Sequence, residues 1–134
     1  MSIEKIFEAN AFYLKDTYIL RLENITTKKK KIICLLHGFP SNKQKNYDIA
    51  ENLCFLGYTV YIFHYDGLGL SRGIFSFKKC FNIMENILNF INETDQPDNI
   101  SLVGHSWGGY IALTRFNSLI NKGKLVLLAP LTRF

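Results

Sequence analysis

A serine flanked by glycines is the clearest candidate for chemistry in this sequence. Residues 104–108 read Gly-His-Ser-Trp-Gly, a G-x-S-x-G pattern between a segment expected to be a strand and one expected to be a helix. There, Ser106 would sit on a sharp turn that exposes its Oγ, and side chains at Gly104 or Gly108 would collide across that turn. The following helix would direct free backbone N–H groups and its positive dipole end to the same place. The pattern predicts a nucleophilic serine; an ordinary strand–helix crossover is the alternative.

A second turn, at residues 36–40 (LHGFP), follows the first strand expected in the core. A loop at this point can supply a backbone donor for a developing oxyanion. We assign that donor to the N–H of Phe39, with the N–H of Trp107 as its partner. Gly38 is expected to shape the loop, and His37 to brace it by a hydrogen bond rather than to act as the catalytic base.

A third glycine-containing loop, residues 63–73 (FHYDGLGLSRG), invites comparison with a dinucleotide-binding fingerprint. The G-x-G-x-x-G spacing requires glycine at position 72, where the chain has Arg72. The loop also follows the second core strand, whereas the fingerprint belongs to the first strand–helix turn. The sequence therefore does not predict a dinucleotide site here.

Alternating periodicity along the chain predicts the elements that position these loops. We expect strands at residues 12–14, 17–22, 32–36, 59–63, 99–103 and 124–129, and helices at residues 49–54, 77–92 and 107–120. Gly57 is expected to end the first helix, and Ser76 to cap the second. This order predicts an α/β fold, a mostly parallel sheet with flanking helices, in which residues 1–30 form a hairpin region and residues 31–134 a parallel βα core.

Composition sets the limits of the fold. The chain has 134 residues, of which 48% are hydrophobic and 20% charged, enough for one small domain and unlike a disordered, collagen-like or disulfide-stapled chain. The net charge of +5 comes partly from four consecutive lysines at residues 28–31. We expect that run to be a solvated loop rather than a nucleic-acid or membrane patch, since such patches usually include exposed aromatic residues.

Cysteine usage and the N-terminus favour a cytoplasmic protein. The three cysteines lie within apolar patterns and are expected to be reduced core residues. No targeting signal is recognisable, and the longest apolar runs, residues 32–36 and 125–129, have five residues each, too few to span a membrane. Because the three His and three Cys residues are scattered without ligand spacing, we expect no metal, and nothing implies an organic cofactor.

The three loops, in this order, resemble the α/β-hydrolase superfamily, most closely its esterase and prolyl-oligopeptidase-like serine hydrolases. The resemblance runs from about residue 32 to residue 130 and identifies this chain as the N-terminal portion of such a fold. It implies Ser106 as the nucleophile, Phe39 and Trp107 as oxyanion donors, and a small ester or peptide-like substrate. It also implies that Tyr65 either touches the substrate or orients the oxyanion loop.

The resemblance is incomplete at the triad. In this superfamily an Asp or Glu and then a His follow the serine, yet the 28 residues after Ser106 contain none of the three. His64 is a candidate stand-in base, which Asp66 could orient, unless strand alternation points His64 into the core. His105 is not expected to serve, because neighbouring side chains on so tight a turn do not face one another. Asp66 itself stands where many relatives have arginine.

Two hypotheses follow. The chain is an acyl-transferring serine hydrolase that is completed by strands from a separate chain, or it is a non-catalytic remnant or interaction module. The segment at residues 125–129 is expected to be an unprotected edge strand, able to pair with a complementary chain or a second copy. The tail at residues 131–134 would be little cover for it.

Overall fold

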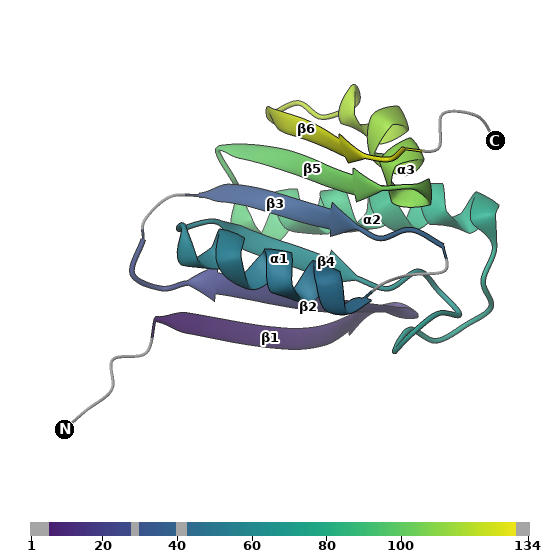
Figure 1. Cartoon of the computed structure of the whole chain (residues 1–134), viewed down its shortest axis with the longest axis horizontal. Coiled ribbons are helices and arrows are strands. Elements are labelled where there is room, and N and C mark those ends of the chain that lie inside the picture. The colour runs from purple at the N-terminus through teal and green to yellow at the C-terminus, as the bar shows by residue number, and fades with distance from the viewer. Residues whose placement is uncertain (1–5, 28–29, 40–42, 131–134) are drawn as a thin grey trace.

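A six-stranded sheet lies at the centre of the molecule, with strand order β1-β2-β4-β3-β5-β6 (Figure 1). The computed structural model describes residues 6–27, 30–39 and 43–130. Strands β3 to β6 run parallel, and β2 joins the hairpin to β4 in antiparallel fashion. This confirms the predicted α/β class. The elements are β1 (Phe7–Leu14), β2 (Thr17–Asn24), β3 (Lys31–Leu36), α1 (Lys43–Phe55), β4 (Thr59–Phe63), α2 (Phe77–Asp95), β5 (Asn99–His105), α3 (Trp107–Phe116) and β6 (Lys122–Leu128).

The predicted hairpin is present and is longer than expected. Strands β1 and β2 pair over eight residues each, from Phe7 opposite Asn24 to Leu14 opposite Thr17. The two-residue turn between them places Lys15 at a positive φ of 54°, the left-handed conformation that such tight hairpin turns require.

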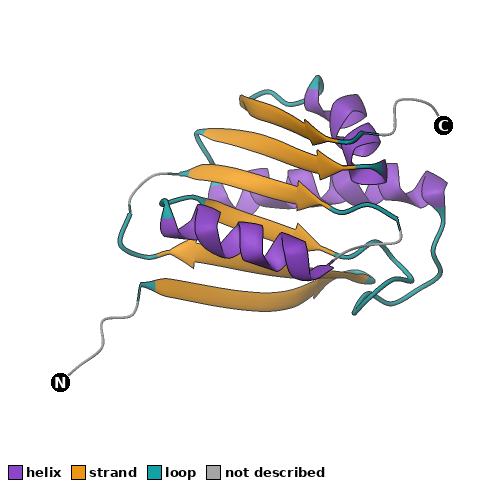
Figure 2. Cartoon of the chain, in the orientation of Figure 1, coloured by secondary structure: helices purple, strands orange, loops and turns teal. Residues whose placement is uncertain are grey.

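Helices cover both faces of the sheet (Figure 2), which is why the central strands are apolar without interruption. Alternate side chains of β3 divide between the two layers: Ile33 and Leu35 pack with Ala50 of α1 in one cluster. Cys34 and Leu36 belong to the larger cluster beneath α2 and α3. The sheet thus has a rigid centre from which the loops at the carboxyl ends of β3, β4 and β5 project.

The helix boundaries agree with the sequence at some ends and differ at others. Gly57 follows α1 with φ of 105°, and its N–H donates to the Cys54 carbonyl, so the predicted stop is confirmed. Ser76 occupies the N-cap of α2 without a side-chain capping bond, and α2 continues to Asp95 rather than stopping at residue 92.

Helix α3 ends earlier than predicted. It stops at Phe116 instead of residue 120. The N–H and the hydroxyl of Ser118 both donate to the carbonyl of Arg115, and the N–H of Leu119 donates to Phe116. These tight bonds turn the chain so that Leu119 enters the core with only 5% of its surface exposed. The burial of Leu119 explains the early end.

Strand β6 forms one edge of the sheet in the described part of the chain. Its side chains alternate: Leu125 and Leu127 pack toward the main core, whereas Val126 and Leu128 are each 42% exposed. The tail expected to lie near this edge, residues 131–134, and half of the lysine run, residues 28–29, are outside the described residues. Among the residues that are described, no helix has the length and apolar character needed to cross a membrane.

Candidate active site

Ser106 occupies a strained turn between β5 and α3. Its φ of 54° and ψ of −115° are unusual for a residue with a side chain, and such conformations cluster at functional sites. Two backbone hydrogen bonds hold the turn: the Ser106 N–H donates to the Leu128 carbonyl at 3.0 Å, and the Tyr110 N–H donates to the Ser106 carbonyl at 3.2 Å. The first bond extends the pairing of β5 with β6 by one residue. The side chain of Ser106 remains partly exposed.

The two glycines of the motif are required by close backbone packing. A Cβ at Gly104 would overlap the backbone of Gly108 in the first turn of α3, as the sequence predicts. A Cβ at Gly108 would instead overlap the carbonyl of Leu36, at the end of β3. The first turn of α3 is therefore pressed against the strand that leads into the expected oxyanion loop.

The loop after β3 passes directly beside the nucleophile turn. A Cβ placed at Gly38 would lie 3.2 Å from both the Ser106 Cβ and the His105 Nδ1. The His37 Nε2 accepts the Tyr65 N–H at 3.3 Å, so its Nδ1 carries the proton and donates to the Gly38 carbonyl at 2.7 Å. In a trans peptide the Gly38 carbonyl and the Phe39 N–H point in opposite directions. The Phe39 N–H thus points away from the His37 ring, and the predicted bracing role of His37 is confirmed.

Tyr65 braces the same loop from inside. Its side chain is fully buried, and its hydroxyl donates to the His37 carbonyl at 2.8 Å. Burial raises the pKa of Tyr65 well above its ordinary value, so the phenol stays a neutral donor. Of its two expected roles, contact with substrate or orientation of the oxyanion loop, this geometry fits only the second.

The hypothesis that His64 stands in for the missing base does not fit its surroundings. The imidazole is 2% exposed and stacks on Tyr18, with ring centroids 5.1 Å apart. Its Nδ1 accepts the Leu70 N–H at 3.0 Å, and its Nε2 lies 3.2 Å from the Tyr47 hydroxyl. Leu70 lies in the loop after β4 and Tyr47 on α1, so both nitrogens are engaged by other residues. The ring points inward, which is the alternative that strand alternation left open.

Asp66 does not orient His64 as hypothesised. Its carboxylate accepts the Thr17 hydroxyl at 2.6 Å and lies 3.8 Å from the Lys79 ammonium. Asp66 therefore ties the loop after β4 to β2 and to the start of α2.

A cavity opens next to the nucleophile turn on the α1 side of the sheet. It has a volume of about 300 Å³ and is lined by His37, Gly38, Asn46, Ile49, His105, Leu128 and Ala129. The exposed His105 contributes to this wall. The cavity thus connects the expected oxyanion loop with the end of the edge strand β6.

Sequence reasoning missed the aromatic residues on the other side of the turn. The Phe39 ring stacks on Phe75, with centroids 4.9 Å apart and planes at 8°. Phe77 contacts Phe39 edge-on at 5.3 Å and Trp107 at 5.2 Å. The F-x-F spacing at residues 75–77, at the start of a helix, was the available signal, but the sequence placed Phe77 only in the core face of that helix.

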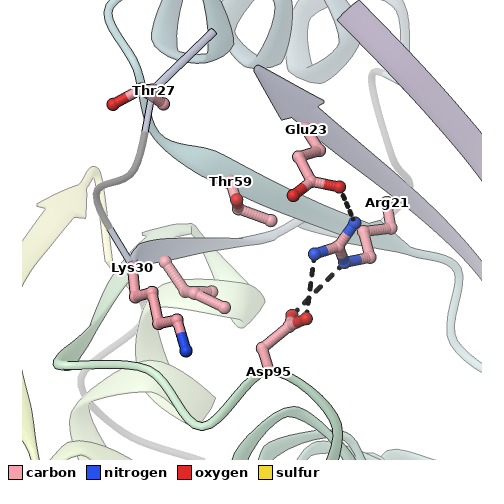
Figure 3. A pocket seen from close by; sticks show the side chains of 7 residues that line it. Arg21, Glu23, Thr27, Lys30, Thr59 and Asp95 are labelled. Atoms are coloured by element: carbon pink, nitrogen blue, oxygen red, sulfur yellow. Dashed lines mark hydrogen bonds and ion pairs between the residues drawn. The ribbon is translucent and has the colours of Figure 1, made fainter. Parts of the chain in front are cut away.

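A second cavity, of about 320 Å³ and lined mainly by polar residues, lies at the opposite end of the sheet, where β3 and β4 begin (Figure 3). Arg21 there lies between two carboxylates: its Nη1 is 2.8 Å from Glu23, and its Nη2 is 2.8 Å from Asp95. The Tyr61 hydroxyl also donates to Asp95 at 2.5 Å. We call these four residues the Arg21–Asp95 clamp. It joins β2 and β4 to the end of α2, and its charged groups are occupied by one another.

The described residues do not form a recognisable metal-binding site. No group of three or more His, Cys, Asp or Glu side chains in that part of the chain is placed to hold a metal ion. The described residues around Ser106 provide a hydroxyl, two candidate backbone donors and the residues that brace the loop of Gly38.

A mostly parallel sheet with a strained serine turn between β5 and α3, and a glycine-containing loop after β3 beside it, defines an α/β-hydrolase fold. The chain belongs to the hydrolase family described as "Serine aminopeptidase, S33", whose family model matches residues 27–134. Among the curated proteins, none matches the chain.

Solved structures share this fold at low sequence identity. An α/β serine hydrolase without a lid from Xanthomonas campestris has a TM-score of 0.76 at 17% identity, covering 96% of this chain and 63% of that one. An esterase from Pyrococcus furiosus has a TM-score of 0.73 at 17% identity, covering 92% of this chain and 51% of that one. An α/β serine hydrolase homologue from Coxiella burnetii has a TM-score of 0.70 at 19% identity, covering 96% and 65%. The chain thus spans between 51% and 65% of the length of these structures.

Proposed function

We propose that the chain carries the nucleophilic half of a serine hydrolase acting on a carboxylic ester or a peptide-like substrate. The observation that carries the proposal is the strained Ser106, held between Gly104 and Gly108 and flanked by the loop of Gly38. In the reaction the Ser106 Oγ bonds to the carbonyl carbon, and the leaving group departs with the serine proton. Water then hydrolyses the acyl-serine, which releases the acid and restores the hydroxyl.

Two backbone N–H groups are proposed to stabilise the oxyanion. Trp107 is the first residue of α3, where N–H groups lack partners within the helix and the helix dipole is positive. The second donor is Phe39, whose peptide is oriented by the bond between His37 and the Gly38 carbonyl. Donors fixed before the reaction stabilise a developing negative charge without reorganising, which is why such groups contribute strongly to catalysis.

The acid and the base are proposed to come from a segment outside these 134 residues. The 28 residues after Ser106 contain no Asp, Glu or His, and both nitrogens of His64 are engaged elsewhere. The edge of β6 and the cavity beside His105 lie next to Ser106, so a segment that pairs with β6 would reach the nucleophile. Without that segment, Ser106 is expected to acylate slowly, since a serine hydroxyl without a base is a weak nucleophile.

The partner of β6 is therefore proposed to be a complementary segment that carries the acid and the base, or, in its absence, a second copy of the chain. The exposed Val126 and Leu128 also favour a second candidate function, a non-catalytic interaction module. We propose a cytoplasmic location, which the three free, buried cysteines support, and a reaction without cofactor.

A fluorophosphonate probe, followed by mass spectrometry, tests this function. We expect one slow adduct on Ser106 that is absent from Ser106→Ala and whose rate is unchanged in His64→Asn, which keeps a polar side chain in the loop. An adduct rate that collapses in a folded His64→Asn variant would restore His64 as the base. The absence of any adduct would favour the interaction module.

A further inference from the structure

Three phenylalanine rings form a continuous surface beside the proposed nucleophile. Phe39 follows β3, Phe75 lies in the loop before α2, and Phe77 is the first residue of α2. Phe39 stacks on Phe75 at 4.9 Å, and Phe77 meets them edge-on at 5.3 Å and 4.8 Å respectively. We call these three residues the aromatic platform.

The aromatic platform joins the two proposed oxyanion donors. Phe39 carries one donor on its own backbone, and Phe77 packs edge-on against the ring of Trp107, which carries the other, at 5.2 Å and 83°. A substrate carbonyl oxygen held by both N–H groups would therefore place its carbon close to these rings. The platform thus offers a surface for one of the two groups attached to that carbon.

The exposure of the platform indicates what it can bind. Phe39 is 45% exposed and Phe75 and Phe77 are partly exposed, while the neighbouring Ile74 is 81% exposed. The ammonium group of Lys79 on α2 donates to the Ile74 carbonyl and lies 3.8 Å from Asp66. The exposed parts of these rings offer an apolar surface, which gains free energy when an apolar group covers it.

We propose that the aromatic platform binds the acyl chain of the substrate and selects esters of medium-length, apolar carboxylic acids. This inference rests on the proposed function, since Ser106 and its donors fix where the acyl chain begins. Each methylene that the rings remove from water should tighten binding about fourfold. Short or charged acyl groups gain nothing from this surface.

Binding without reaction tests the platform separately from catalysis. The Ser106→Ala variant, with ¹³C-labelled phenylalanine, is titrated with methyl hexanoate and with methyl butanoate, and the ring signals are followed by NMR. We expect the signals of Phe39, Phe75 and Phe77 to shift, and methyl hexanoate to bind about fifteenfold more tightly for its two extra methylenes. In a Phe75→Ala background, which removes the ring and most of its apolar area, most of this preference should be lost. In Phe90→Ala, which removes a ring packed on Phe12 at 5.2 Å, it should be kept.

Equal affinity for the two esters, or shifts confined to other phenylalanines, would overturn the inference. Ring shifts that follow protein concentration instead of ester would identify a second copy of the chain as the occupant, and would overturn it too. Because Ser106→Ala cannot react, selective ester binding would uphold the platform even if Ser106 of the unchanged chain proved inert. Selective ester binding together with an inert Ser106 would contradict the proposed function but not the role of the platform.

Discussion

The Nδ1 of His37 donates to the carbonyl oxygen of Gly38, its sequence neighbour, at 2.7 Å. This bond holds the peptide that carries the Phe39 N–H. The Tyr65 hydroxyl holds the same loop by donating a hydrogen bond to the His37 carbonyl. We therefore propose that these two buried residues set the orientation of the expected oxyanion donor. In this proposal His37 and Tyr65 are positioning residues.

Replacing His37 should impair the reactivity of Ser106 more than the stability of the fold. We expect His37→Ala to lower the rate of Ser106 labelling by about tenfold to a hundredfold, approaching the cost of losing an oxyanion donor. His105→Ala, on the exposed side of the turn, is the control and should change the rate less than about twofold. Equal rates in both variants would show that the His37 bond does not set the donor. The measurement is the rate of Ser106 labelling in each variant, at a temperature at which thermal unfolding shows both to be folded.

The packing of α3 against β3 predicts a severe effect at Gly108. A methyl group there overlaps the Leu36 carbonyl, and neither backbone can move independently, so Gly108→Ala should cost about 3 kcal/mol of unfolding free energy. Gly57→Ala is the matched control: its positive φ strains alanine, but the nearest atom is 3.6 Å away, and about 1–2 kcal/mol should be lost. Urea unfolding measures both, and a smaller loss at Gly108 than at Gly57 would contradict the packing.

The Arg21–Asp95 clamp should stabilise the fold without affecting the site. Asp95→Asn removes a carboxylate charge to which Arg21 and Tyr61 both donate hydrogen bonds. The side chain of Arg21 is 16% exposed and that of Asp95 is 13% exposed. We expect a loss of about 2–3 kcal/mol. Glu23→Gln, whose carboxylate is 39% exposed, should cost less than about 1 kcal/mol. Similar losses of unfolding free energy in both variants, measured by urea unfolding, would contradict a stabilising role of the Arg21–Asp95 clamp.

Alkaline pH should destabilise the protein through its buried thiols. Burial raises the pKa of Cys80 from 9.0 to about 11, so the folded state keeps the thiol protonated where the unfolded state loses the proton. The contribution of the Cys80 thiol to the free energy of unfolding is complete below pH 9 and is lost as the pH rises through 11. Between these values the free energy of unfolding should fall by about 1.4 kcal/mol per pH unit. Cys80→Ala should flatten that part of the curve, while Cys34, whose pKa is also raised by burial, still contributes. Identical slopes between pH 9 and 11 would refute this assignment.

The exposed face of β6 predicts association. Val126→Lys places a charge on the edge strand, where Val126 is 42% exposed, and should leave the unfolding free energy unchanged within about 0.5 kcal/mol. If β6 pairs with a second copy, sedimentation of the unchanged chain should depend on concentration, and the variant should remain monomeric. Indistinguishable sedimentation of the two would contradict pairing through β6.

Local patterns predicted the framework well because they are short-range. Glycines at positions 104 and 108, the hairpin turn and the stop at Gly57 each follow from backbone sterics within a few residues. The inward turn of His64 stayed one of two alternatives, and the burial of Tyr65 could not be predicted, since both depend on hydrogen bonds to distant segments, at Tyr47 and His37. The stacking of Phe39 on Phe75 joins loops that only the folded sheet brings together. The early end of α3 was missed because a buried leucine, not a glycine or proline, ends it.

The most direct test of the proposed site is the labelling rate of Ser106 by a fluorophosphonate with and without added imidazole. The chain is proposed to hold a poised nucleophile and its oxyanion donors but no base. Imidazole, supplied at a pH above its own pKa, should therefore speed Ser106 labelling at least about tenfold, part of what a positioned general base contributes. Ser106→Ala should give no adduct in either condition. An unlabelled Ser106 even with imidazole, or rapid labelling that imidazole leaves unchanged, would contradict the account.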